Sequence, residues 1–339
     1  MTFQPMPPAV RPNDVPSMPR VIGPALAEAA LPWPALLRAL NEAFVQGVEV
    51  PPRQVLRWPD GAGNEVMSLL MPAWSLDAAD PGGGFYGVKL IQVAPGNAAR
   101  GLPGLHGLYV LHEAATGRPV AVIDGDVLTA RRTAAASALA ASLLARADAS
   151  RLLVVGAGRL AALLPHAHAA VRDLREVNIW ARRPEAAAAL AAQLRAQGLP
   201  AQAVRDLPEA VASAHIISTA TLSQQPLVQG AWLAPGSHLD LVGSFTPAMR
   251  EADDEALRGA RIVPDTAEAT TKSGDLIEPL QRGVIRPEDV ADTLATLCRG
   301  QAPGRTSDAQ RTVFKSVGNA LEDLAAARLV WAQAQRSSK

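Results

Sequence analysis

The spacing of apolar and polar residues changes along the chain, and the second half shows the clearer pattern. After residue 150, short apolar runs alternate with stretches whose apolar residues recur at helical spacing. Strands are predicted for "RLLVV", "REVNIW", "HIISTAT", "SHLDLVG" and "ARIVPD", and a helix that ends at Gly198 for "PEAAAALAAQLRAQG". Because strands that alternate with helices form parallel sheets, we predict a doubly wound α/β domain over residues 133–312.

The first half of the chain has a different pattern. Residues 22–47 predict a short helix, a break at proline and an amphipathic helix closed by glycine. Residues 53–128 contain short β-rich runs separated by proline and glycine, among them a hairpin in "HEAATGRPVAVID" with "ATGR" as its turn. An alanine-rich helix is predicted from about Thr133 to Ala147, and a long closing helix is predicted for the segment that begins "TVFKSVGNALEDLAAA".

These elements predict a discontinuous architecture. Residues 21–132 and 313–339 would form an outer α+β domain with mostly antiparallel strands, and the doubly wound domain would be inserted between them. Residues 1–20 contain six prolines and no long apolar run, so we expect a flexible N-terminal arm and no signal peptide there.

Composition restricts the possible partners and compartment. The chain has 339 residues, 48% apolar and 19% charged, which is typical of a soluble globular protein. Its 32 basic and 32 acidic residues cancel, so no overall charge attracts nucleic acid or an acidic membrane. The single cysteine, Cys298, excludes a disulfide framework and a paired-cysteine zinc site. No run of about 18 apolar residues predicts a membrane span, and the expected compartment is the cytoplasm.

A glycine-rich turn follows the first strand of the doubly wound pattern. In "VVGAGRLA", Gly156, Gly158 and Ala161 form a GxGxxA pattern between an apolar strand and a helix. The first glycine permits the tight turn, the second lets a pyrophosphate approach the backbone, and the small third residue lets helix and strand pack closely. We therefore predict a Rossmann-type dinucleotide site at Gly156, Ala157, Gly158, Arg159, Leu160 and Ala161, rather than a turn that serves packing alone.

The end of the next strand indicates which dinucleotide binds. Enzymes that use NAD usually place an acid there for the ribose hydroxyls, whereas this chain has Arg182 and Arg183 in "WARRPE". Guanidinium groups bind a 2′-phosphate through charge-assisted hydrogen bonds that a carboxylate would oppose. The pair therefore favours NADPH, with NADH as a weaker coenzyme; the alternative is that both arginines are solvated surface charges.

Several segments together resemble the ornithine cyclodeaminase/mu-crystallin family. They occur in family order from about residue 50 to the C-terminal helix: "PPRQVL", "SLLMPAW", "GVKLI", "AVIDGDVLTARRTAAASALAA", "LLVVGAGRLA", "DLVGSFTPAMRE" and "TVFKSVGNALEDLAAA". The resemblance implies the two-domain layout predicted above and a homodimer built through the outer domain. It also implies hydride transfer between a nicotinamide and a carbon that bears nitrogen and a carboxylate.

The resemblance also implies a set of cationic substrate residues. Arg53 in "PPRQ", Lys89 in "GVKL" and Arg132 in "ARRT" match the family's substrate-binding positions. Convergent cations can fix the single carboxylate of a small imino or amino acid. Lys89 is the candidate catalytic residue for handling a proton at the substrate nitrogen, and we expect neighbouring cations to lower its pKa. The alternative is that each residue forms an ordinary surface ion pair.

Further positions are expected near the coenzyme. Thr133, Ser316 and, with a structural histidine as the alternative, His106 match such positions in the family. The segment "STATLS" follows a strand of the predicted sheet, so Thr219 and Thr221 are expected on the nicotinamide side. No metal site is expected, because no carboxylate is spaced to join the histidines of "HAH".

The segment "VGSFTPAMRE" distinguishes the members of the family. In ornithine cyclodeaminases the corresponding segment resembles Gly-Gly-Asp-x-Pro. When Gly243, Pro247 and Glu251 are aligned with that segment, Phe245 takes the position of the aspartate. Phenylalanine cannot hold an ammonium group by charge, although a weak cation–π contact is conceivable, and an apolar wall suits a ring. We therefore predict an NADPH-dependent reductase of cyclic imino acids, which makes proline or pipecolate; the resemblance implies the L forms. The alternatives are an ornithine cyclodeaminase, an alanine dehydrogenase and a non-enzymatic mu-crystallin-like ligand-binding protein.

Overall fold

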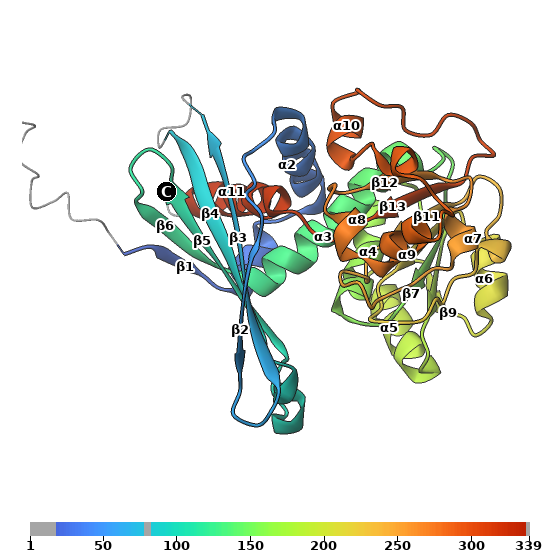
Figure 1. The fold of residues 1–339 in the computed structure, drawn as a ribbon, viewed down its shortest axis with the longest axis horizontal. Helices are drawn as coiled ribbons and strands as arrows, with labels where there is room; N and C mark the ends of the chain where they lie inside the picture. The colour runs from blue at the N-terminus through green and yellow to red at the C-terminus, as the bar shows by residue number, and fades with distance from the viewer. Residues whose placement is uncertain (1–17, 78–82, 337–339) are drawn as a thin grey trace, which may run out of the picture.

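Two β-sheets joined by one long helix, α3 (Gly125–Leu144), make up the protein (Figure 1). The computed structural model describes residues 18–77 and 83–336. Most of the predicted N-terminal arm lies outside the described residues. Its predicted end is wrong, because strand β1 (Arg20–Ile22) already begins at Arg20.

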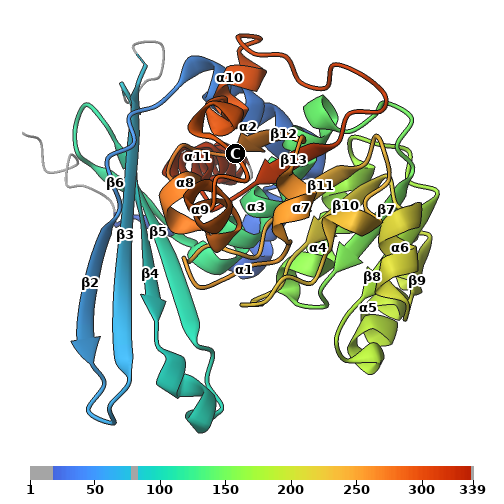
Figure 2. The same ribbon diagram turned by 45° about the vertical axis from the view of Figure 1, so that its right-hand side comes forward.

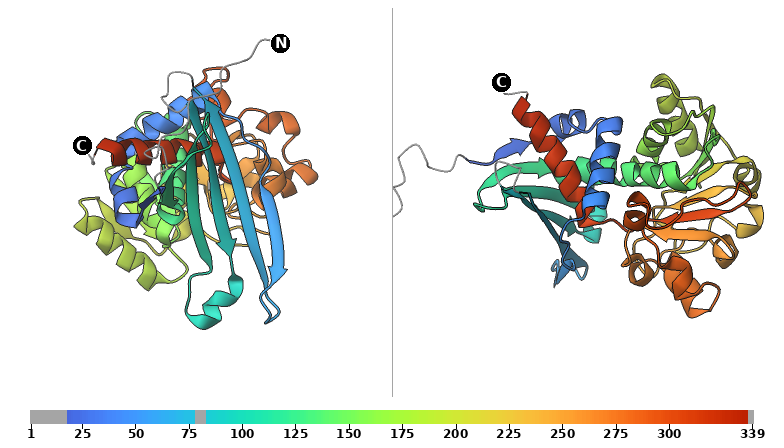
Figure 3. Two further views of the ribbon diagram at one scale, coloured as in Figure 1. Left: turned by 90° about the vertical axis from the view of Figure 1, so that its left-hand side faces the viewer. Right: turned by 90° about the horizontal axis from the view of Figure 1, so that it is seen from above.

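The first sheet has six strands in the order β1-β6-β5-β4-β3-β2. Only the β1–β6 pair is parallel, and the predicted hairpin is confirmed as β5 and β6. Helices α1 (Pro24–Ala29), α2 (Trp33–Gln46) and α11 (Ala320–Arg336) lie on one face, and the described residues place no helix on the opposite face (Figures 1 and 3). The other strands are β2 (Gln54–Pro59), β3 (Glu65–Leu76), β4 (Gly84–Val93), β5 (Leu105–Glu113) and β6 (Pro119–Asp124).

The second sheet has seven strands, all parallel, in the order β12-β13-β11-β10-β7-β8-β9 (Figure 2). This topology confirms the predicted fold class, a Rossmann-type doubly wound sheet joined to an α+β layer. The strands are β7 (Arg151–Val155), β8 (Glu176–Trp180), β9 (Ala201–Ala203), β10 (Ile216–Thr219), β11 (His238–Leu241), β12 (Arg261–Pro264) and β13 (Thr312–Lys315). The helices around them are α4 (Arg159–Ala169), α5 (Pro184–Ala196), α6 (Leu207–Ser213), α7 (Asp254–Leu257), α8 (Ala269–Lys272), α9 (Gly274–Gln281) and α10 (Leu294–Cys298).

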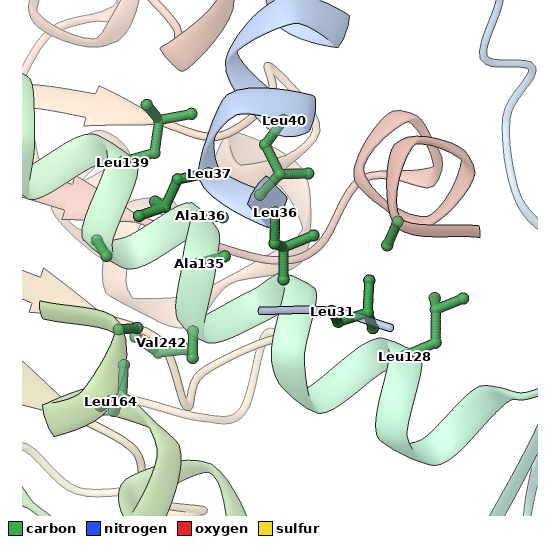
Figure 4. Close-up of a cluster of buried hydrophobic side chains, with 14 of the residues drawn as sticks. Leu31, Leu36, Leu37, Leu40, Leu128, Ala135, Ala136, Leu139, Leu164 and Val242 are labelled. Carbon is green, nitrogen blue, oxygen red and sulfur yellow. The ribbon is translucent and has the colours of Figure 1, made fainter. Parts of the chain in front are cut away.

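Helix α3 connects the cores of the two layers. Its side chains pack against the α2 side that carries Leu36 and Leu40 and, on the opposite side of α3, face Leu164 of α4 (Figure 4). Three α3 leucines, Leu128, Leu139 and Leu144, are buried in the same cluster. Because each buried leucine stabilises the fold by about 1.5–3 kcal/mol, this shared core fixes the two sheets relative to each other.

The predicted boundaries of α3 are wrong at both ends. The helix begins at Gly125 because the Asp124 carboxylate accepts a hydrogen bond from the Val127 amide at 2.8 Å and so caps the first turn. The residues that follow Asp124 had the β-rich composition of a strand, but the cap ends β6 there. At the other end, the helix stops at Leu144, before the predicted Ala147.

The predicted closing helix is also wrong at its start. Residues Thr312–Lys315 are fully buried and form strand β13 between β11 and β12. Helix α11 begins only at Ala320, after Gly318 has turned the chain with a φ of 84°. The predicted boundary at residue 312 therefore falls inside the parallel sheet, and the chain leaves that sheet after Lys315. No helix in the described part of the chain has the length and apolar character needed to cross a membrane.

Candidate active site

A cavity of about 660 Å³ lies at the carboxyl edge of the parallel sheet. It lies beside β7 and β10, where the strand order reverses, which is where doubly wound sheets bind nucleotides. Three loops at this edge supply its lining: the turn after β7, the end of β8 and the loop after β10. The lining residues are Gly156, Ala157, Gly158, Trp180, Ala181, Arg182, Arg183, Ala186, Ala220, Thr221, Leu222, Ser223 and Leu227.

The geometry of the glycine turn fits a bound dinucleotide. Gly156 has a φ of 134°, and a Cβ there would lie 2.6 Å from the carbonyl oxygen of Ala220. A Cβ on Gly158 would meet no protein atom within 4 Å, although this residue is the N-cap of α4. The fold therefore requires the first glycine, whereas the second leaves open space where a pyrophosphate would approach the helix N-terminus. Ala161 is fully buried and lets α4 pack on the sheet.

The two arginines after β8 line this cavity and are exposed. Neither forms an ion pair among the described residues, so both guanidinium groups are available to an anion. Arg159 instead pairs with Asp126 of α3 at 3.5 Å, and Leu160 packs against the core. Ala157 and Gly158 line the cavity at the glycine turn, whereas Arg159 and Leu160 do not.

The predicted cations Lys89 and Arg132 meet at Asp323 of α11. Lys89 Nζ lies 2.7 Å from Asp323 Oδ2, and Arg132 Nε donates to Asp323 Oδ1 at 2.7 Å. Arg132 Nη1 donates to Glu322 Oε2, also at 2.7 Å. Strand β4, helix α3 and helix α11 thus bring together groups that are far apart in the sequence, and Lys89 and Arg132 are only 1% and 4% exposed.

Arg53 joins the same cluster through Gly318. Arg53 Nη2 donates to the Gly318 carbonyl oxygen at 3.1 Å and forms an ion pair with Glu268 at 3.2 Å. A Cβ on Gly318 would lie 2.9 Å from Arg132 Nη2, so Arg132 lies directly beside the glycine whose carbonyl oxygen Arg53 contacts. Arg53, Glu268 and Gly318 line a cavity of about 110 Å³. The structure therefore brings all three predicted cations to one place.

Burial and neighbouring charges set the protonation of this cluster. The pKa of Lys89 is lowered to about 8, chiefly by burial, while Asp323 opposes the shift and Arg132 adds to it. The direction is the predicted one, but the larger cause is burial rather than the neighbouring cation. Burial also raises the pKa of Glu322 to about 8. Although burial favours the neutral form of Asp323, attraction to Arg132 and Lys89 lowers its pKa.

Four residues predicted near the coenzyme do not line the cavity at the glycine turn. Thr219 is buried, and its hydroxyl donates to the Asp240 carbonyl oxygen at 3.4 Å. The Ser316 hydroxyl donates to Asp265, and that of Thr133 donates to the Thr129 carbonyl oxygen within its own helix. His106 pairs with Gln92 across the sheet, three positions from the Lys89–Tyr109 pair, so its side chain faces away from Lys89.

Thr221 lines the cavity, and Glu251 fixes the loop that carries it. The Glu251 carboxylate accepts hydrogen bonds from the amides of Thr221 at 2.7 Å and Gly243 at 2.6 Å, and from the Thr221 hydroxyl at 2.8 Å. It thereby joins the loops after β10 and β11. Phe245 stands on the second of these loops and is 52% exposed, so the chain alone does not pack it into a closed apolar wall.

Several buried acids at this site were not among the predicted residues. Glu322 and Asp323 hold the cations, and Asp265 accepts hydrogen bonds from the amides of Val317 and Gly318. The sequence carried a signal for the first two, because "LEDLAAA" places adjacent acids in an apolar helix. Of the histidines in "HAH", His166 bonds to Gln197 and His168 is buried 3.7 Å from Asp240. The described residues hold no group of three potential metal ligands.

Comparison with known proteins decides the family. The ornithine cyclodeaminase/mu-crystallin family matches residues 28–338. The chain belongs to this family. The Δ1-pyrroline-2-carboxylate reductase of Paracoccus denitrificans is 44% identical over 241 residues, which are 70% of this chain and 76% of the relative.

Solved structures of the family superpose over nearly the whole chain. The structure of Thermococcus litoralis Δ1-pyrroline-2-carboxylate reductase in complex with NADH and L-proline has a TM-score of 0.86 at 29% identity, covering 94% of this chain and 98% of the other. An archaeal alanine dehydrogenase dimer with bound NAD has a TM-score of 0.85 at 30% identity, covering 95% and 97%. These relatives confirm the predicted class of enzyme, a nicotinamide-dependent oxidoreductase that acts on carbon–nitrogen bonds.

Proposed function

We propose that this enzyme uses NADPH to reduce cyclic α-imino acids, Δ1-pyrroline-2-carboxylate to proline and Δ1-piperideine-2-carboxylate to pipecolate. The observation that carries the proposal is the convergence of three cations, in which Arg53 and Arg132 lie at Gly318 and Lys89 meets Arg132 at Asp323. Gly318 follows the carboxyl end of strand β13, at the same edge of the parallel sheet as the nucleotide cavity. The name of the Paracoccus denitrificans relative and the ligands of the Thermococcus litoralis structure support the same substrate class.

In this proposal the arginines bind the substrate carboxylate. Arg132 donates hydrogen bonds from Nε and Nη1 to the two acids of α11, and its Nη2 lies beside Gly318. Arg53 reaches the same glycine from β2's end of the first sheet. A carboxylate bound between Arg53 and Arg132 Nη2 would accept charge-assisted hydrogen bonds from two directions, which fixes the orientation of the ring.

Lys89 is the proposed proton donor to the ring nitrogen. With a pKa of about 8, its ammonium is mostly protonated at neutral pH yet loses its proton readily, which suits a general acid. Protonation of the nitrogen makes C2 of the imine electron-poor. Because Lys89 is buried, the proton is delivered without competition from bulk water.

The cavity at the glycine turn is the proposed coenzyme site. Its open space at Gly158 accommodates a pyrophosphate, and Arg182 and Arg183 would bind the 2′-phosphate of NADPH. When bound, the reduced nicotinamide supplies the hydride that C2 receives. Phe245 takes the position that the resemblance gives to an aspartate in the family's cyclodeaminases. The chain therefore lacks the carboxylate that would bind the side-chain amine of ornithine at this position.

A substrate panel tests the function. NADPH absorbance is followed with each cyclic imine, with pyruvate plus ammonia, and ammonia release is measured from ornithine with NAD⁺. We expect turnover with the cyclic imines and its loss in Lys89→Met, with NADPH affinity unchanged as the control. Turnover of pyruvate with ammonia alone would make the enzyme an alanine dehydrogenase, and wild-type rates in Lys89→Met would remove Lys89 from the mechanism.

The open face of the first sheet is the proposed homodimer surface. Leu56, Trp58 and Leu108 are 53%, 43% and 50% exposed, and strand alternation places them on the face opposite Lys89. A face with several exposed large apolar side chains is typical of a protein–protein contact. Light scattering of Trp58→Glu would show a monomer if this face forms the dimer.

A further inference from the structure

Three buried carboxyl groups surround the two buried cations of the substrate site. Asp323 and Glu322 come from α11, and Asp265 follows β12; all three side chains are 0–1% exposed, as is Lys89. Arg132 is 4% exposed. Charges at this depth are tolerated only when they are paired and hydrogen-bonded, so the pairing determines which carboxyl groups are ionised.

The three carboxyl groups are bonded differently. Asp323 faces one cation with each oxygen: Oδ1 accepts a hydrogen bond from Arg132 Nε, and Oδ2 forms an ion pair with Lys89 Nζ, both at 2.7 Å. Asp265 Oδ2 accepts from the amides of Val317 and Gly318 at 2.9 and 2.7 Å. Glu322 bonds Arg132 through Oε2 alone, and its buried Oε1 has no hydrogen-bond partner among the described residues.

Charge balance bears on the protonation. Lys315, a third buried cation, attracts Asp265 more strongly than Arg132 does, but it also lies 3.5 Å from Asp275 and attracts Glu251. The buried cations Lys89, Arg132 and Lys315 are therefore outnumbered by the buried acids around them, which are Asp323, Glu322, Asp265, Asp275 and Glu251, so ionisation of every acid would leave an excess negative charge. We propose that Asp323 is the ionised positioning residue that holds Lys89 protonated and in register with Arg132, whereas Glu322 is a neutral acid. This inference rests on the proposed function for its catalytic meaning, but its physical content is a property of the coenzyme-free protein.

The groups that face Lys89 from each packed element determine how its charge responds. They are Asp323 and Glu322 from α11, Arg132 from α3 and Tyr109 from β5, with Asp265 beyond Arg132. Asp323 is the largest influence that raises the pKa of Lys89, and Glu322 is a minor one. Replacing the Asp323 carboxylate with a neutral amide should therefore lower the pKa of Lys89. Replacing the Glu322 carboxyl group with an amide should change the pKa of Lys89 little.

Nuclear magnetic resonance can measure this directly because the chain has only four lysines, Lys89, Lys272, Lys315 and Lys339. The protein is labelled with lysine carrying ¹³C at Cε, and the Lys89 signal, assigned by its loss in Lys89→Met, is titrated without coenzyme. We expect Asp323→Asn to move the Lys89 midpoint downward by about one pH unit or more. The matched variant Glu322→Gln, an isostere of the neutral acid, should move it by less than about half a unit.

Activity provides the second measurement. The pH above which kcat/KM for Δ1-pyrroline-2-carboxylate falls should move downward in Asp323→Asn and should move by less than about half a unit in Glu322→Gln. An unchanged Lys89 midpoint in Asp323→Asn, or equal shifts in both variants, would overturn the inference. Absence of turnover in the wild type would instead refute the proposed function and leave the lysine titration interpretable.

Asp323→Asn leaves two buried cations short of a counter-charge, so the variant can fail to fold. The double variant Lys89→Met/Asp323→Asn removes one of those cations as well. If Asp323 neutralises Lys89, the double variant should regain at least about half of the Tm lost in Asp323→Asn. Purely additive losses of Tm in the single and double variants would contradict the pairing.

Discussion

Alanine substitution at the two glycines of the nucleotide turn should have opposite consequences. At Gly156 the new Cβ would lie 2.6 Å from a backbone oxygen, in a residue with a φ of 134°. Backbone strain of about 1–3 kcal/mol and overpacking of about 1–3 kcal/mol then add, so we expect Gly156→Ala to lose about 2–6 kcal/mol of unfolding free energy. At Gly158 the φ is −85° and no atom lies within 4 Å, so Gly158→Ala should keep its stability within about 1 kcal/mol.

The coenzyme affinities should follow the opposite order. A methyl group on Gly158 occupies the space reserved for the pyrophosphate, so we expect NADPH affinity to fall at least about tenfold, or about 1.4 kcal/mol. Thermal unfolding and NADPH fluorescence titration of both variants measure the two effects. Wild-type NADPH affinity in Gly158→Ala would refute the assignment of this turn, and a wild-type Tm in Gly156→Ala would refute the steric reasoning.

Three further predictions concern other parts of the molecule. Arg182→Asp with Arg183→Ser should weaken NADPH far more than NADH, and equal losses in fluorescence titrations would show that these arginines do not bind the 2′-phosphate. Glu268→Gln should free Arg53 to bind the substrate and so lower KM for the imino acid about two- to fivefold at constant kcat. The size follows from the Arg53–Glu268 ion pair, which is worth at most about 1 kcal/mol because Glu268 is 36% exposed. A raised KM would contradict this prediction. Burial lowers the pKa of His238 from 6.5 to about 3, so between these pH values the unfolded chain binds a proton that the folded protein does not. The free energy of unfolding should therefore decrease by up to about 1.4 kcal/mol for each unit by which the pH falls from 6.5 towards 3. Urea unfolding should show a smaller decrease in His238→Gln.

The sequence predicted those features that depend on local pattern. Alternating strands and helices gave the parallel sheet, and the glycine spacing placed the turn that lines the nucleotide cavity. Features that depend on distant partners were missed. The sequence of strand β13 was predicted as helix because the two strands that pair with it, β11 and β12, lie earlier in the sequence and are not visible in the local pattern. Pairing with both strands and burial on both faces stabilise it as a strand.

The site shows the same division. Resemblance to the family placed Arg53, Lys89 and Arg132 correctly in one cluster, but it did not reveal the acids that neutralise two of them. Adjacent acids at the start of an amphipathic helix usually face water, and here α11 lies across the sheet so that Glu322 and Asp323 are buried instead (Figure 1). Thr219 does not line the cavity, because successive side chains of a strand alternate and that of Thr219 is buried in the interior.

A crystal structure of the complex with NADPH and L-proline would test the account most directly. We expect the proline carboxylate between Arg53 and Arg132, its nitrogen within hydrogen-bond distance of Lys89 Nζ, and the 2′-phosphate against Arg182 and Arg183. Proline bound away from these cations, or a coenzyme that bypasses the turn at Gly158, would contradict it.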